Sequence, residues 1–119
     1  MTYRYFKLDE FKCKHCGENK IDPDFVSKLD NARGMAGVPF VITSGYRCIP
    51  YDLTLGGKRN HTTGLAADIA VPDDRSRYFI IKYLLLCGFA RIGVGPDFIH
   101  VDMNPQHNLC RIWGYYEHN

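Results

Sequence analysis

Apolar residues recur at helical spacing between positions 21 and 37. They form a stripe that we expect to be buried, made of Phe25, Val26, Leu29, Ala32 and Ala36. Asp22 is suited to cap the start of this helix, Pro23 fits its first turn, and Gly37 can end it. The pattern therefore predicts a helix over "IDPDFVSKLDNARGMAG".

The most apolar segment, "RSRYFIIKYLLLC", predicts a second helix over positions 75–87. The Asp73–Asp74 pair can cap its start, and Gly88 can close it. Because Lys82 interrupts it and it is short, we expect a buried helix rather than a membrane span. The opening "MTYRYFKLDEF" has no apolar run long enough for a signal peptide, so we expect a protein made in the cytoplasm with no membrane partner.

Shorter runs of β-branched and apolar residues predict strands. They lie at positions 38–47, 65–71, 90–95 and 98–103. We expect the last two to form a hairpin around Gly95–Pro96. Positions 51–60, "YDLTLGGKRN", are predicted as a polar loop, and the tail 110–119 is expected to lie over the core through its aromatic residues.

Two helices and about four short strands, joined by loops too brief for repeated βαβ units, indicate an α+β fold with a mainly antiparallel sheet. A length of 119 residues predicts one domain over 1–119, which we expect to be a monomer. The hydrophobic fraction of 45% and charged fraction of 24% are those of a globular protein. The net charge of +2 is too small and too scattered for a nucleic-acid-binding face.

Strand alternation places candidate metal ligands together. In "LAADIAV", Asp68 shares a face with Ala66 and Ala70, and in "FIHVDM" His100 shares a face with Phe98 and Asp102. If these strands are neighbours, Asp68 and His100 project from one surface, and His61 can fold back over them. Three such ligands with a fourth position left for water are typical of catalytic zinc. Each histidine alone is equally readable as a surface or hydrogen-bonded residue.

The motifs around these residues resemble those of a known family. "SGYRC", "HTTGLAADIAV" and "DFIHVD" occur in the order and approximate spacing of the zinc D-Ala-D-Ala carboxypeptidase and L-alanyl–D-glutamate endopeptidase family, which includes many phage endolysins. His61, Gly64, Ala66 and Asp68 match the family's H-x-x-G-x-A-x-D motif. Asp97 and His100 match its acidic-x-x-H motif, and the similarity runs from about Phe11 to Trp113.

The resemblance implies a zinc peptidase that cuts peptidoglycan stem peptides. His61, Asp68 and His100 would bind Zn²⁺, which activates a water molecule as the nucleophile. Asp97 would be the general base, since Pro96 predicts a turn from which its side chain can swing towards the metal. Arg47 would stabilise the oxyanion or hold a substrate carboxylate. The peptide bond that is cut, terminal D-Ala or internal L-Ala–D-Glu, stays open.

Two departures from the family bear on substrate preference. Many relatives have Ser two residues before the first ligand, where this chain has Arg59, and "CIPYDLTLGG" lacks the His-Asn that often follows the Tyr-Arg-Cys. The rival hypothesis is a zinc-stabilised binding or phage structural module of the same fold, as in the similar hedgehog signalling domain. Because such a module needs neither Asp97 nor Arg47, we favour an enzyme of phage or bacterial origin that acts on the cell wall after release.

Five cysteines, an odd number without an export signal, argue against a disulfide scaffold. Cys87 lies in the apolar helix and is predicted to be a small core residue. "CKHCG", with Cys13 and Cys16, can be half of a structural zinc site, which Cys48, Cys110 or His15 would have to complete. The alternatives are a reduced surface turn and a local disulfide formed after release.

Several polar and aromatic residues have two possible roles. Asp102 can orient a histidine ligand from behind or be a solvated strand residue. Trp113, Tyr115 and Tyr116 are expected to close the core, with stacking on substrate as the alternative. We expect His107 and His118 at the surface. Lys58 and Arg59 can attract an acidic peptide or form a solvated turn.

Overall fold

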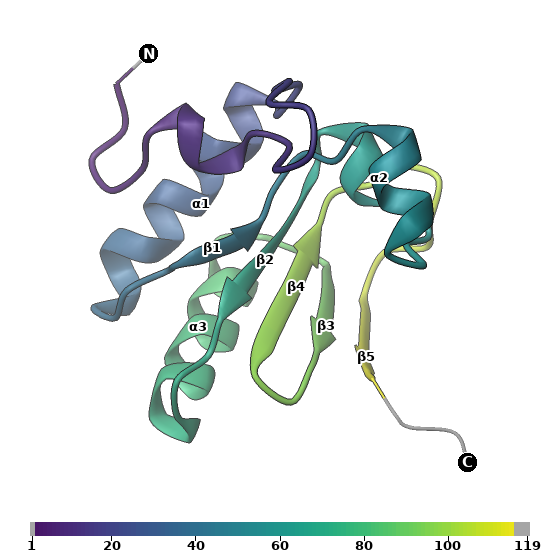
Figure 1. The fold of residues 1–119 in the computed structure, drawn as a ribbon. Coiled ribbons are helices and arrows are strands. Elements are labelled where there is room, and N and C mark those ends of the chain that lie inside the picture. The colour runs from purple at the N-terminus through teal and green to yellow at the C-terminus, as the bar shows by residue number, and fades with distance from the viewer. Residues whose placement is uncertain (1, 116–119) are drawn as a thin grey trace.

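The fold, a computed structural model that describes residues 2–115, is a five-stranded sheet covered on one face by two helices (Figure 1). Its strands are β1 (Ile42–Ser44), β2 (Ala66–Ala70), β3 (Arg91–Val94), β4 (Phe98–Asp102) and β5 (Arg111–Gly114). They lie in the order β1-β2-β4-β3-β5, and all neighbours are antiparallel except β3 and β5. The expected α+β fold with a mainly antiparallel sheet is confirmed.

The two main helices are α1 (Pro23–Ala36) and α3 (Asp74–Leu86), as the apolar patterns predicted. The Asp22 side chain accepts hydrogen bonds from the backbone N–H groups of Asp24 and Phe25, at 2.7 and 3.2 Å. Asp73 caps α3 in the same way through Ser76, and Gly37 ends α1 with the left-handed φ of 71° that glycine tolerates. The predicted caps are thus confirmed.

The core lies between these helices and one face of the sheet. It joins the α1 stripe to apolar residues of α3 and to the inward residues of the central strands, including Ile80, Leu84, Ala67, Ile69, Ile92, Ile99 and Val101. Strand alternation turns Asp68 and His100 towards the opposite face. The helices therefore cover the apolar side of the sheet, and the polar side is left for chemistry.

Three sequence predictions need correction. The strand expected over 38–47 is shortened to β1, and the register of β1 with β2 shifts between Ile42 and Ser44. The loop expected over 51–60 begins inside a short helix, α2 (Ile49–Thr54), with Pro50 in its first turn. The tail adds β5 to the sheet beside β3, rather than lying over the core.

Two short 3-10 helices complete the chain, η1 (Leu8–Phe11) and η2 (His61–Thr63). Within residues 2–115, none of the helices has the length and apolar character needed to cross a bilayer.

Candidate metal centre

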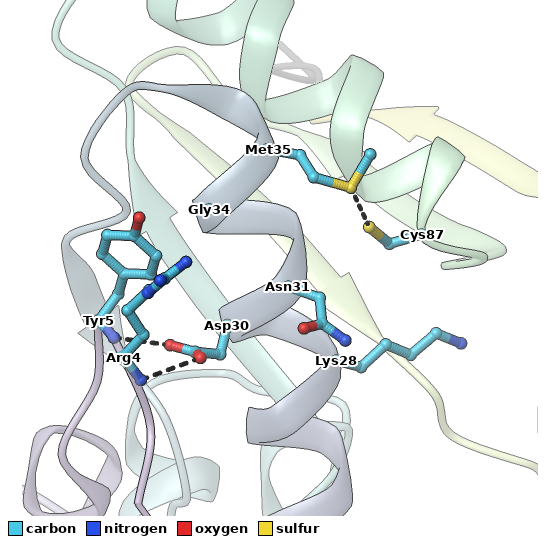
Figure 2. Close-up of a pocket in the computed structure, with 8 residues that line it drawn as sticks. All are labelled: Arg4, Tyr5, Lys28, Asp30, Asn31, Gly34, Met35 and Cys87. Atoms are coloured by element: carbon cyan, nitrogen blue, oxygen red, sulfur yellow. Dashed lines mark hydrogen bonds between the residues drawn. The ribbon is translucent and has the colours of Figure 1, made fainter.

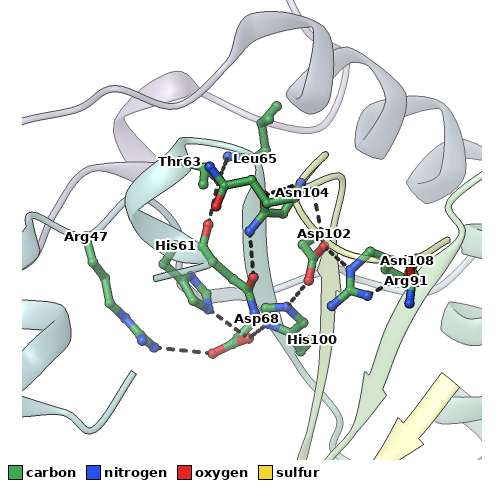
Figure 3. Close-up of polar contacts among 12 residues, drawn as sticks. Arg47, His61, Thr63, Leu65, Asp68, Arg91, His100, Asp102, Asn104 and Asn108 are labelled. Carbon is green, nitrogen blue, oxygen red and sulfur yellow. Dashed lines mark hydrogen bonds and ion pairs between the residues drawn. The ribbon is translucent and has the colours of Figure 1, made fainter. Parts of the chain in front are cut away.

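Three metal-ligating side chains meet on the polar face of the sheet (Figure 3). Asp68 and His100 are direct partners in the register of β2 and β4, and His61 lies in η2 just before β2. Asp68 Oδ1 is 3.3 Å from His61 Nε2 and 3.0 Å from His100 Nδ1. The sequence prediction that these three residues come together is confirmed, and we call them the His/Asp/His centre.

Hydrogen bonds behind the two rings fix how each ring is oriented. His61 Nδ1 lies 2.8 Å from the carbonyl oxygen of Gly45, and His100 Nε2 lies 2.7 Å from Asp102 Oδ2. A carbonyl and a carboxylate only accept, so these nitrogens must donate. The remaining nitrogens, Nε2 of His61 and Nδ1 of His100, therefore turn towards Asp68.

The Asp68 carboxylate and the two ring nitrogens that face it meet at one point, and this arrangement favours a positive charge there. Burial alone would raise the pKa of Asp68, but hydrogen bonds from His100 and His61 outweigh it and hold this pKa well below its usual range. Burial would likewise lower the pKa of His100, yet Asp102 and Asp68 raise it. In the metal-free protein a proton thus takes up this role. Two imidazoles and a carboxylate also form a donor set that suits zinc, so the residues fit the ion.

Asp102 orients the His100 ring, which decides between the two roles considered for it. The side chain is almost fully buried, and its Oδ1 accepts from Arg91 Nε at 2.7 Å and from the backbone N–H of Asn104 at 3.1 Å. Arg91 is held in turn by the carbonyl oxygen of Asn108, at 2.9 Å. Both Asp102 oxygens are therefore occupied, and the carboxylate is fixed behind the ring.

Arg47 lies at the edge of the His/Asp/His centre, on the loop between β1 and α2. Its Nη2 is 3.5 Å from Asp68 Oδ2, and its Nε donates to Ser44 Oγ at 2.9 Å. Nη1 donates to Asp52 Oδ1 at 3.0 Å. These contacts hold the guanidinium plane beside the centre, where sequence analysis expected it.

Asp52 is a member of the site that sequence analysis missed. Its side chain is only 1% exposed, and its Oδ2 accepts from the backbone N–H of Arg59 at 3.0 Å. A side chain at Gly57 would collide with the Asp52 carboxylate, so glycine is needed there. In the sequence, the only indication of this role is that an acidic residue follows Arg47 by five positions. The pairing becomes evident only in the fold, where α2 brings Asp52 back to Arg47.

The structure does not bring Asp97 into this group. Asp97 is exposed in the turn between β3 and β4, where its carbonyl oxygen accepts from Val71 N–H at 2.9 Å. Its carboxylate makes no hydrogen bond or ion pair with any residue in the described range 2–115. The assignment of Asp97 as the general base stays a prediction.

The aromatic residues of the tail lie on the site side of the sheet rather than in the core, which corrects the sequence prediction. The Trp113 ring is 5.7 Å from that of His100 and 4.9 Å from the Arg91 guanidinium, and Tyr115 packs on Phe98 at 5.0 Å. Tyr116 and His118 fall outside the described residues. His107, Lys58 and Arg59 are exposed.

A second group of potential ligands is formed by Cys13, Cys16 and Cys48, which we call the cysteine cluster. The three sulfur atoms lie within 4.8 Å of one another. Among the candidates named from the sequence, Cys48 completes the pair, whereas Cys110 is not part of the group. The His15 ring instead stacks on Tyr51 at 5.4 Å, with 9° between the planes. Cys87 is half-buried and packs against the core, so it is less buried than the core residue that was predicted.

A recess of about 610 Å³ lies elsewhere, between the N-terminal segment and α1 (Figure 2). The Asp30 carboxylate at its wall accepts the backbone N–H groups of Arg4 and Tyr5, at 3.0 and 2.7 Å. On the other side, Cys87 Sγ contacts Met35 Sδ at 3.7 Å. The Asp30 contacts attach the N-terminal segment to α1, the Cys87–Met35 contact joins the end of α3 to α1, and the His/Asp/His centre contributes no residue to the recess.

Comparison with known proteins agrees with this geometry. A family model described as Peptidase M15 matches residues 4–102, which include Arg47, Asp97 and the His/Asp/His centre. A search of curated proteins found no match. Because the family match spans most of the sequence, the chain belongs to the Peptidase M15 family, whose members are zinc-dependent metallopeptidases.

Proposed function

We propose that this protein hydrolyses amide bonds in peptidoglycan stem peptides, using zinc held by His61 Nε2, Asp68 and His100 Nδ1. The observation that carries the proposal is the pair of fixed ring orientations. The Gly45 carbonyl and Asp102 each accept from the outer nitrogen of a ring, so the inner nitrogens face Asp68 and would present their lone pairs to an ion bound there. Such outer hydrogen bonds are a regular feature of zinc–histidine sites.

The neighbouring residues suit acyl transfer. When bound, zinc would polarise the substrate carbonyl and lower the pKa of a water molecule to about 7. Arg47 is the cation beside this position, and its planar fork can donate to the oxygen on which negative charge develops. Because Asp52 and Ser44 already hold two of its nitrogens, the guanidinium needs little reorganisation during the reaction.

Asp97 is proposed as the general base because the family resemblance implies it, and because the other carboxylates at the site are already engaged. Asp68 is a proposed ligand, both oxygens of Asp102 are hydrogen-bonded, and Asp52 is committed to Arg47 and to the Arg59 backbone. Asp97 has an uncommitted side chain on the turn that leads into the strand of His100. To take a proton from the attacking water and pass it to the leaving nitrogen, this turn would have to fold towards the sheet.

The exposed position of Asp97 is also the observation that favours the rival function. A zinc-stabilised binding or phage structural module would keep His61, Asp68 and His100 and would not need a base near them. The presence of Arg47, half-buried and paired with the buried Asp52 beside the centre, is what favours the enzyme. We therefore propose that the protein acts on the cell wall after release, as a lysis enzyme of phage or bacterial origin.

Digestion of purified peptidoglycan tests this function. The zinc-loaded protein is incubated with sacculi, and the released fragments are identified by mass spectrometry. Release of free D-Ala would identify a carboxypeptidase, whereas new L-Ala and D-Glu ends would identify an endopeptidase. The control is His61→Ala, which should release neither. Zinc-loaded protein that leaves the sacculi intact would overturn the proposal in favour of the binding module.

A paired measurement on Asp68 and Asp97 separates ligand from base. Asp97→Ala should keep its zinc and lose turnover by roughly a hundred- to ten-thousandfold, which is the usual cost of removing a general base. Asp68→Ala should lose zinc and turnover together. Wild-type turnover in Asp97→Ala would show that another group takes the proton.

A further inference from the structure

We propose that the cysteine cluster is a second, structural zinc site that fastens the N-terminal segment to the loop carrying Arg47. The three sulfur atoms come from two distant parts of the chain, Cys13 and Cys16 before α1 and Cys48 at the start of α2. Their mutual separation, within 4.8 Å, is compatible with one ion bound to all three. Thiolate is a ligand that selects zinc among the common divalent cations.

The backbone around Cys13 is shaped to hold a thiolate. Cys48 N–H donates to Cys13 Sγ at 3.4 Å, so the loop that supplies the third sulfur also solvates the first. The chain turns tightly after Cys16, since Gly17 N–H donates to the Cys13 carbonyl at 2.9 Å and Gly17 has the left-handed φ of 77°. This turn keeps Cys13 and Cys16 on the same side.

The three cysteines differ in their exposure to solvent. Cys13 is 1% exposed, Cys48 is half-buried and Cys16 is exposed. No further Cys, His, Asp or Glu among residues 2–115 joins the group, so the three sulfur atoms would hold the ion, with the exposed Cys16 on the side open to solvent.

The site would stabilise a contact on which the His/Asp/His centre depends. The segment before α1 has no strand in the sheet, and it reaches the loop through a hydrogen bond from Tyr46 N–H to the Phe11 carbonyl, at 2.7 Å. Gly45 lies so close to Phe11 that a Cβ there would be 2.6 Å from the Phe11 backbone. The same loop provides the Gly45 carbonyl for His61, the Arg47 side chain and Cys48. An ion bound at Cys48 therefore holds in place the loop that orients His61.

Metal content and a spectroscopic probe test this site without any assay of activity. The protein, purified under reducing conditions, should contain about two zinc ions per chain, one of them at the cysteine cluster. Cys16→Ser and His61→Ala should each contain about one, and their double variant none. Because Cys16 is exposed, its substitution does not disturb packing. The matched control is Cys87→Ser, which should keep both ions.

Cobalt substitution of the His61→Ala variant isolates the cysteine cluster. Co²⁺ bound there should give the intense near-ultraviolet absorption of thiolate-to-metal charge transfer, and Cys16→Ser should weaken it. Two zinc ions in Cys16→Ser, or no thiolate absorption in the cobalt-loaded protein, would overturn the proposal. A disulfide between two of the three cysteines in the reduced, zinc-treated protein, detected by mass spectrometry, would overturn it as well.

Discussion

The His/Asp/His centre and the cysteine cluster are joined by one short loop, residues 44–48, and are built in different ways. Two of the three groups in the His/Asp/His centre are direct cross-strand partners, so the register of β2 and β4 sets their spacing. The cysteine cluster takes its sulfur atoms from a turn and from the start of a short helix. The loop contributes to both, through the Gly45 carbonyl and Cys48.

This difference fits the two roles that we propose, catalysis at the His/Asp/His centre and stabilisation of the fold at the cysteine cluster. In the His/Asp/His centre each ring is held from behind by a hydrogen bond, and Arg47 lies at the edge beside Asp68. Among the described residues, the cysteine cluster has no comparable cation held beside it by a buried carboxylate, and Cys13 Sγ accepts from the Cys48 backbone N–H. We therefore expect substitutions in the two groups to have different consequences.

The largest effect should come from removing a ligand of the His/Asp/His centre. His61→Ala and His100→Ala should lose the zinc of this centre and all measurable peptidase activity, because no other group can replace a missing imidazole. Cys16→Ser should lose one ion and keep activity at moderate temperature. Zinc analysis and peptide hydrolysis on the same preparations give the comparison, and activity in His100→Ala would break it.

A smaller effect is expected from Arg47→Lys, which tests whether the centre is built for catalysis. Lysine keeps the charge and loses the planar fork that contacts Ser44, Asp52 and Asp68 together. Turnover should fall on the order of a hundredfold, the usual cost of losing an oxyanion donor, with zinc content unchanged. Arg59→Lys, with an exposed side chain near the same loop, is the matched control and should retain activity. Equal turnover in both variants would make Arg47 a structural residue.

The smallest effect should come from Asp102→Asn, which acts on the ring of His100 rather than on the metal itself. The amide oxygen can still accept from Nε2, but the negative charge that strengthens the ligand and pairs with Arg91 is lost. Zinc affinity should drop by roughly ten- to a hundredfold. Competition with a chelator of known affinity measures it. The cysteine cluster should bind its ion as tightly as before, and weakening of both sites would indicate general unfolding instead.

The predictable part of the fold is local. Asp22, Pro23 and Gly37 mark the ends of α1 because caps and turns depend on a few adjacent residues. That Asp68 and His100 project from one face follows from strand alternation once the strands are taken as neighbours, whereas their direct pairing is set by the register of β2 and β4. In the tail, β5 could not be foreseen, because its parallel pairing with β3 depends on contacts distant in sequence.

In the site, only the residues that belong to a recognisable sequence motif could be predicted. Asp52 lies in a stretch that reads as a polar loop, and only tertiary structure buries it beside Arg47. The sequence left Cys48, Cys110 and His15 as equal partners for Cys13 and Cys16, since nothing local distinguishes them. In the fold, His15 stacks on Tyr51, and the turn into α2 brings Cys48 to Cys13 and Cys16.

Anomalous diffraction from crystals of the zinc-loaded protein tests the central claim most directly, because it locates the ion without reference to activity. We predict a peak about 2.0–2.1 Å from His61 Nε2 and from His100 Nδ1, and about 2.0–2.2 Å from an Asp68 oxygen. Coordination through His61 Nδ1 or His100 Nε2, or the absence of a peak between these three residues, would contradict the account.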